Sequence, residues 1–204
     1  MNVFVVYAHP SEDSFTRHVR DSFIRGLEEN GHSYVLSDLY KMGFRTDMSE
    51  AEYLREANFN EGTPLPEDVI AEQNKINSSD TIVFIYPVFW TEAPAKLVGW
   101  FDRVWTYGFA YGNRSMKQLE KALMICIAGH SLQHLKEYGH FEAMKTVMLG
   151  DRMFDRVKSK DMIILDSMSK YSMEARNANW NRNLEIAFEA GRSYDLRTAP
   201  AYFW

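Results

Sequence analysis

The sequence predicts a doubly wound α/β domain built on five parallel strands. Short apolar runs rich in β-branched and aromatic residues recur along the chain, each of a length that suits a buried strand. Longer segments with helical spacing lie between these runs, so that strand and helix alternate. At 204 residues the chain has the length of one domain, which we expect to span residues 1–204.

Each element follows from its own local pattern. The first strand is predicted at residues 3–8, and the first helix begins at Phe15 and ends before Asn30-Gly31. Residues 38–66 contain two glycines and two prolines and are predicted to be irregular. Further strands are predicted at residues 33–37, 81–86, 122–128 and 162–165, and further helices at 67–77, 94–105, 142–157 and 173–190.

The loop between the first strand and the first helix is a candidate phosphate seat. The first turn of a helix leaves backbone N–H groups without partners, and its dipole favours negative charge. The loop lacks glycine and is neither a GxGxxG nor a Walker A loop, so a phosphate would be held by His9, Ser14 and Thr16 together with helix N–H groups. The alternative is an ordinary strand-to-helix connection that Ser14 caps.

The loop after the third strand is unusually aromatic. Phe89 and Trp90 follow within four residues of Tyr86, although loops generally avoid exposing large apolar side chains. A flat aromatic ligand lying against this loop would explain them, and packing in the core or at a subunit interface is the alternative. The helix predicted at 94–105 has an apolar face wider than the usual stripe of ~100°, which we interpret as a subunit contact.

Composition excludes several classes of protein. A net charge of −5 and a pI near 5.7, without a cluster of Lys and Arg, argue against a nucleic-acid surface. The single cysteine, Cys126, lies in an apolar run and is expected to be a buried core residue in a reducing compartment. No apolar run approaches the length of a membrane span, so we expect a cytoplasmic protein. The apolar tail at 201–204 is expected to pack on the body or on a partner subunit.

Two kinds of chemistry are also disfavoured. His130, His134 and His140 lack Cys or carboxylate partners at ligand spacing, so no metal site is predicted. Ser14 and Ser131 stand in no G-x-S-x-G motif, which argues against a hydrolase.

Ordered blocks of residues from Val3 to about Gly139 carry a family resemblance. The blocks are Tyr7-Ala8-His9 with Ser14-Phe15, Ser37-Asp38-Leu39-Tyr40, Ala57-Asn58-Phe59, Pro87 through Trp90 with Pro94-Ala95, Gly99 through Val104, and Phe109-Ala110-Tyr111. They resemble the NAD(P)H:quinone oxidoreductases, flavodoxin-like flavoproteins of the DT-diaphorase type. The resemblance implies a five-stranded sheet with helices on both faces and a homodimer that binds FAD, with FMN as the alternative. It also implies that hydride passes from NAD(P)H through the flavin to a quinone.

The resemblance implies three groups of cofactor-binding residues. They are His9, Ser14, Phe15 and Thr16 for the pyrophosphate; Pro87, Val88, Phe89, Trp90 and Thr91 along the flavin ring; and Ile127, Ala128, Gly129 and His130 at its pyrimidine side. Asn60 falls where members that hold FAD place a Gln beside the dinucleotide. Tyr111 is the candidate for contact with substrate, contributed from the second subunit.

The chain departs from the family pattern around its fourth strand. The family's Thr-Thr-Gly-Gly is here Ile127-Ala128-Gly129-His130. The family's flavin-contacting Tyr falls on Leu135, and its His or Asn falls on Phe141. Tyr138 and His140 lie close by and are the candidates for the catalytic proton relay.

A non-enzymatic function is the alternative to an oxidoreductase. The chain could be an electron-carrier flavodoxin or a regulatory subunit that senses nucleotide. A simple flavodoxin usually has a phosphate loop rich in Ser, Thr and Gly, whereas this chain has His9 and the block at Phe15.

Overall fold

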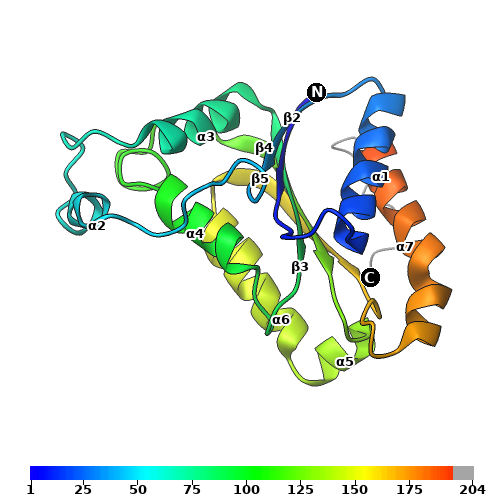
Figure 1. Ribbon diagram of the computed structural model, residues 1–204. Coiled ribbons are helices and arrows are strands. Elements are labelled where there is room, and N and C mark those ends of the chain that lie inside the picture. Colours follow the sequence, from blue (N-terminus) through cyan, green and yellow to red (C-terminus); the bar gives the residue numbers. More distant parts are fainter. Residues whose placement is uncertain (195–204) are drawn as a thin grey trace.

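The computed structural model describes residues 1–194 and contains one five-stranded parallel sheet (Figure 1). The strands are β1 (Asn2–Tyr7), β2 (Ser33–Asp38), β3 (Thr81–Pro87), β4 (Leu119–Ile127) and β5 (Val157–Leu165). Their order, β2-β1-β3-β4-β5, and parallel pairing confirm the predicted fold class. The apolar tail at 201–204 lies outside the described residues.

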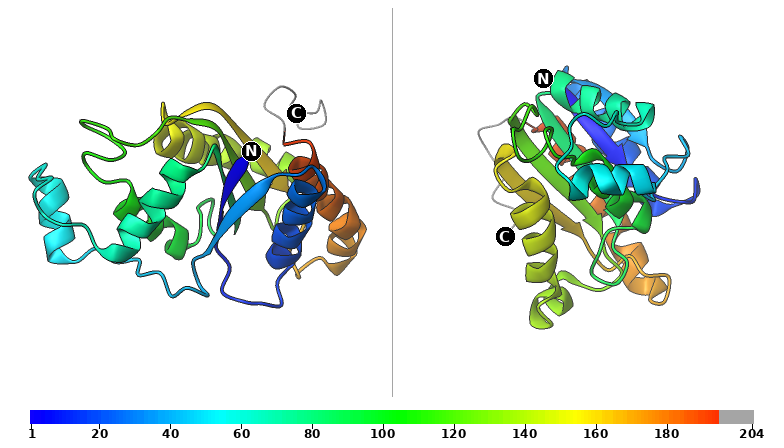
Figure 2. Two further views of the ribbon diagram at one scale, coloured as in Figure 1. Left: turned by 90° about the horizontal axis from the view of Figure 1, so that it is seen from above. Right: turned by 90° about the vertical axis from the view of Figure 1, so that its left-hand side faces the viewer.

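Helices cover both faces of the sheet (Figure 2). Their bounds are α1 (Phe15–Glu29), α2 (Glu50–Ala57), α3 (Glu67–Ser78), α4 (Ala95–Val104), α5 (Leu132–Glu137), α6 (His140–Lys145), the π-helical segment η1 (Thr146–Met153) and α7 (Met173–Arg192). Buried side chains of α1 and α7 join one core cluster, and those of α3, α4, α6 and η1 join the other. None of the helices in residues 1–194 is both long enough and apolar enough to cross a membrane.

Two glycines allow α1 and α7 to pack backbone against backbone. A Cβ on Gly26 would lie 2.2 Å from the carbonyl oxygen of Phe188, and one on Gly191 would lie 2.1 Å from that of Phe23. Both distances are far below van der Waals contact, so neither position tolerates a side chain. This close packing brings the start of α7 beside the start of α1.

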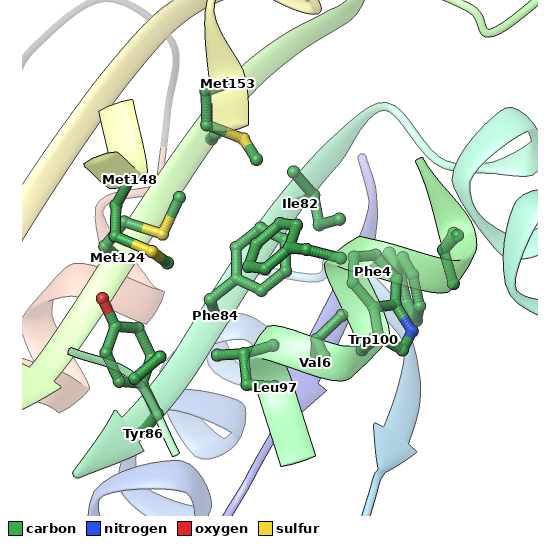
Figure 3. Close-up of a cluster of buried hydrophobic side chains, with 14 of the residues drawn as sticks. Phe4, Val6, Ile82, Phe84, Tyr86, Leu97, Trp100, Met124, Met148 and Met153 are labelled. Atoms are coloured by element: carbon green, nitrogen blue, oxygen red, sulfur yellow. The ribbon is translucent and has the colours of Figure 1, made fainter. Parts of the chain in front are cut away.

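The interpretation of the apolar face of α4 as a subunit contact was wrong. Leu97, Trp100 and Val104 are fully buried in the core of the same chain, and Figure 3 shows Leu97 and Trp100 beside Phe84. The face is wide because α4 packs against the sheet on one side and has neighbouring helical segments on others. Trp105 extends this packing by donating its indole N–H to the carbonyl oxygen of Arg152 in η1 (2.7 Å).

Helix α2 was missed in the segment predicted to be irregular. Its start is a capping box: Ser49 Oγ accepts from Glu52 N, and the Glu52 carboxylate accepts from Ser49 N. This Ser-x-x-Glu signature was readable in the sequence. Glycines and prolines that flank α2 indicate irregular structure and mask this signature.

The prediction of a single helix at 142–157 was also wrong. Helix α5 precedes it, Gly139 with φ of 73° separates α5 from α6, and α6 continues into η1, which ends before Phe154. Strand β5 then begins at Val157, five residues before the predicted start of 162. Its first half is polar because β5 is an edge strand, where a continuous apolar run is not required.

Candidate active site

Three of the predicted loops meet at the carboxyl edge of the sheet. The ladders continue past the strands: Ala8 N donates to Ile85 O (3.1 Å), and Val88 N donates to Ile127 O (2.9 Å). Ala128 N donates to the last residue of β5 in the same way. The loops after β1, β3 and β4 therefore lie side by side, where ligands bind in open α/β sheets.

The start of α1 offers unused donors. Ser14 is the N-cap, and its hydroxyl accepts from Arg17 N (3.1 Å) and lies 3.4 Å from the hydroxyl of Tyr7. Phe15 and Thr16 have buried side chains, and their backbone N–H groups make no hydrogen bond within residues 1–194. These two residues can therefore serve an anion through their backbones, whereas the sequence had suggested the Thr16 side chain.

His9 stands at the exit of β1. Its Nδ1 lies 3.0 Å from Ser11 N and 3.1 Å from Ser11 O, which fixes the ring and leaves Nε2 for a ligand. Burial lowers the pKa of His9, and the hydrogen bond to the Ser11 backbone opposes this shift. In the tautomer in which Nδ1 accepts from Ser11 N, Nε2 carries the proton and can donate one hydrogen bond to a ligand.

The loop after β3 is a tight and strained turn. Phe89 N donates to Glu92 O (2.8 Å) and Glu92 N donates to Phe89 O (2.9 Å), with Trp90 at φ of 51° and Thr91 at φ of 67°. Two consecutive positive φ values make a type I′ turn, which normally uses Asn-Gly, and a β-branched residue there is an outlier. Such residues cost about 1–3 kcal/mol each and concentrate at functional sites.

This turn presents groups that a ring could use. Trp90 is completely exposed and Phe89 is about half exposed. The backbone N–H groups of Trp90 and Thr91 make no hydrogen bond to any described residue. The preceding Pro87 is buried as the last residue of β3, and Val88 is half-buried.

The loop after β4 is held firmly. Ile127 and Ala128 are buried, Met168 N donates to Ala128 O (2.9 Å), and Ser167 N donates to His130 O (3.1 Å). A Cβ on Gly129 would meet Ser169 at 3.5 Å, an ordinary van der Waals contact, so packing alone does not require glycine there.

A row of ring side chains continues from this loop. His130 stacks on His134 with centroids 4.2 Å apart, and His134 lies 4.5 Å from Tyr138. Tyr138, the C-cap of α5, is in turn 6.1 Å from His140 at the start of α6. The two predicted relay residues, exposed Tyr138 and half-buried His140, therefore belong to one row that begins in the predicted cofactor loop.

Asn60 and Tyr111 lie apart from this edge. Figures 1 and 2 show α2 projecting from the body, and Tyr111 donates to the Glu56 carboxylate of α2 (2.6 Å). Within residues 1–194 the Asn60 side chain, just beyond α2, bonds only to Gly62 and Thr63 of its own loop, and the Asn60 N–H donates to Arg55 O of α2 (2.9 Å). Burial and the Glu56 carboxylate raise the pKa of Tyr111 to about 12. Within one chain these two residues do not join the other candidates.

Arg176 is a candidate site residue that the sequence analysis missed. It lies in the second turn of α7 with 9% of its surface exposed, and its guanidinium carbon is 4.6 Å from the Trp180 ring centroid and 5.9 Å from that of Phe15. Its Nε is buried without an acceptor, and it forms no ion pair within residues 1–194. A buried cation beside the α1 N-terminus thus lacks a counter-ion. Nothing in the sequence distinguished it from other helix arginines.

The described part of the chain contains no group of three or more His, Cys, Asp or Glu side chains arranged to hold a metal ion.

Comparisons with known proteins place the chain in a family. A family model described as flavodoxin-like fold matches residues 1–178. An NAD(P)H:quinone oxidoreductase from Methanothermobacter marburgensis is 46% identical, with a TM-score of 0.89 over 95% of this chain and 96% of that one. An uncharacterized NAD(P)H oxidoreductase of Haemophilus influenzae is 34% identical over 148 residues, which are 68% of this chain and 70% of that protein.

A third relative is longer than this chain. NAD(P)H dehydrogenase (quinone) 1 of Rattus norvegicus is 32% identical over 125 residues, which are 55% of this chain and 46% of the rat protein. The chain thus spans about half the length of several curated relatives that it matches. The family model and the relatives confirm the resemblance: the chain belongs to the flavodoxin-like family, among relatives that include NAD(P)H:quinone oxidoreductases.

Proposed function

We propose that the chain is a flavin-dependent NAD(P)H oxidoreductase that reduces quinones or similar acceptors. The observation that carries the proposal is an anion seat beside a strained turn at one edge of the sheet. The seat combines the α1 N-terminus, the His9 ring and the buried guanidinium of Arg176. The turn offers two backbone N–H groups and two exposed aromatic rings. A ligand in which a phosphate is joined to a flat ring would fit both the anion seat and the turn.

Different groups of residues would bind the phosphate and the ring of the flavin. Phosphate would accept hydrogen bonds from His9 Nε2, Arg176 and the N–H groups of Phe15 and Thr16. The ring would lie along residues 88–91 and 127–130. A flavin held there would supply the hydride-transfer chemistry between NAD(P)H and the acceptor. Tyr138 and His140 are proposed to move the accompanying proton, because they lie in the ring row that starts at His130.

Steady-state consumption of NADPH with menadione tests this function. An oxidoreductase of this class should turn over many times per flavin. A protein that binds flavin but consumes little NADPH in this assay would instead be a carrier or a nucleotide-sensing subunit.

We propose FAD as the cofactor, with FMN as the alternative. Support for FAD comes from Asn60, which stands where FAD-binding members place a Gln. Purified protein should show flavin absorbance, and mass analysis of the released cofactor should give FAD. Released FMN would contradict the choice of FAD, and absence of flavin bands after incubation with excess FAD would contradict the flavin site itself.

We expect a homodimer in which each pocket draws residues from both chains. Asn60 and Tyr111 lie away from the carboxyl edge of their own chain, and the projecting α2 region exposes Tyr53, Leu54 and Phe59. A second copy would cover these apolar side chains and receive Tyr111 beside its ring site. Light scattering at micromolar concentration should give twice the mass of the chain. A monomeric mass would contradict this arrangement.

His9→Ala should weaken flavin binding by about tenfold to hundredfold, because a hydrogen bond to a charged group contributes roughly 1.5–3 kcal/mol. The fold should be unaffected, since His9 lies in a loop. Fluorescence titration of flavin gives the dissociation constant. His32→Ala, a histidine change at the opposite edge of the sheet, serves as the matched control. Equal affinities of the His9 variant and wild type would mean that the phosphate seat is misplaced.

We propose a cytoplasmic location because the chain has a single cysteine, Cys126, and so cannot form an internal disulfide. Burial raises the pKa of its thiol to about 12. A protein without internal disulfides suits a reducing compartment. Fractionation of the source cells would test the location.

A further inference from the structure

The turn Phe89–Glu92 needs an external support. Trp90 and Thr91 both have positive φ, and neither is a residue type that favours this region. Such a conformation persists only where surrounding contacts determine it. On its N-terminal side the turn is fixed by Val88, whose N–H continues the ladder of β3 with β4.

On the C-terminal side the support is the Glu92 carboxylate. Its Oε1 accepts from the backbone N–H of Ala93 (2.7 Å) and from Nη1 of Arg152 (3.0 Å). Its Oε2 lies 3.5 Å from Nη2 of the same guanidinium. The Arg152 guanidinium therefore faces both carboxylate oxygens of Glu92, the residue that closes the turn.

Arg152 is itself immobilised. Its side chain is 13% exposed, and its guanidinium carbon lies 4.8 Å from the ring centroid of Phe101. Nη1 also lies 2.8 Å from the sulfur of Met148, and the Arg152 carbonyl accepts from Trp105 Nε1 (2.7 Å). The arginine thus connects Glu92 to η1 and α4, two rigid parts of the core.

We propose that Glu92 and Arg152 form a positioning clamp that holds the Trp90-Thr91 turn in its flavin-binding conformation before the flavin arrives. The inference rests on the proposed flavin site and adds two residues to it that do not themselves contact the ring. Without the clamp, the free protein would relax to an unstrained turn. Flavin binding would then have to restore the strained conformation, and affinity would fall accordingly.

A double-mutant cycle with Thr91→Gly tests the clamp. Glycine adopts positive φ without strain, so a turn with glycine at position 91 needs less support. Arg152→Met should weaken flavin binding by about tenfold or more when Thr91 is present. In the Thr91→Gly background, Arg152→Met should lower flavin affinity by less than about threefold. The flavin midpoint potential, measured on the same four proteins, should follow the same pattern.

Controls separate positioning from general damage. Arg192→Met removes another arginine ion pair, with Glu189, at the far end of α7, and should leave flavin affinity unchanged. If Arg152→Met does not fold, Glu92→Gln replaces it in the cycle, because Arg152 then keeps its packing on Phe101.

The outcomes are distinct. An equal loss of affinity in both backgrounds would mean that Arg152 is merely structural and would overturn the clamp, as would wild-type affinity in both the Arg152 and Glu92 variants. Wild-type protein that binds no flavin would instead overturn the proposed function, whatever the variants do.

Discussion

Arg103→Met is expected to destabilise the fold by about 3–5 kcal/mol, because removing one partner leaves buried charges without compensation. The Arg103 side chain on α4 is fully buried. It donates to Glu52 of α2 (2.8 Å), to both carboxylate oxygens of Asp68 of α3, and to the carbonyl oxygen of Arg45 (2.8 Å). One guanidinium thus ties three helices together. Urea denaturation at pH 7 measures the loss of unfolding free energy.

The pH dependence gives this prediction a second test. Burial tends to raise the pKa of Glu52, but hydrogen bonds from Ser49, Arg45 and Arg103 outweigh it and lower the pKa from 4.5 to about 2. A depressed carboxyl pKa contributes stability that is complete above pH 4.5 and is lost as the pH falls toward 2. The Asp68 pKa is lowered too, chiefly by its hydrogen bond to Arg103.

The gap in stability between wild type and Arg103→Met should therefore narrow as the pH falls below about 4.5. Arg114→Met is the matched control, since it removes a more exposed ion pair with Asp155 (2.6 Å) and should cost no more than about 1 kcal/mol. A gap that stays constant with pH would show that Arg103 stabilises the fold by packing alone.

Arg176→Met should lower flavin affinity by about hundredfold while leaving the flavin-free protein at least as stable as wild type. The affinity falls because a buried guanidinium forms strong, charge-assisted hydrogen bonds with phosphate. Stability is preserved because Arg176 has no counter-ion within residues 1–194, so its burial costs free energy that methionine does not require. Titration with flavin and thermal denaturation of the flavin-free protein measure the two effects.

The opposite signs of these two effects distinguish a ligand-binding role from a structural one. Arg192→Met, a change in the same helix far from the seat, should move neither quantity appreciably. A variant of Arg176 that loses stability in the absence of flavin, and affinity in proportion, would place the residue in the core and not in the site.

Local pattern was enough to predict the strands and most of the helices. Strands β1, β3 and β4 are buried on both faces and must be continuously apolar, which makes them visible in the sequence. The positions of His9, residues 87–91 and residues 127–130 followed, because parallel strands all end at one edge. The capping box of α2 and the break at Gly139 were local signals too, and they were overlooked.

Other features depend on contacts between distant segments. The apolar width of α4 could not reveal whether a partner or the same chain covers it, because both bury the same side chains. The separation of Tyr111 from the turn Phe89–Glu92 depends on where α2 projects. The support of that turn depends on Arg152, sixty residues beyond Glu92 in the chain. The sequence by itself determined the fold class and the sheet edge at which the candidate site lies. Only the tertiary structure made Arg176 a candidate for that site, because the packing of α7 on α1 brings its guanidinium beside Phe15 at the start of α1.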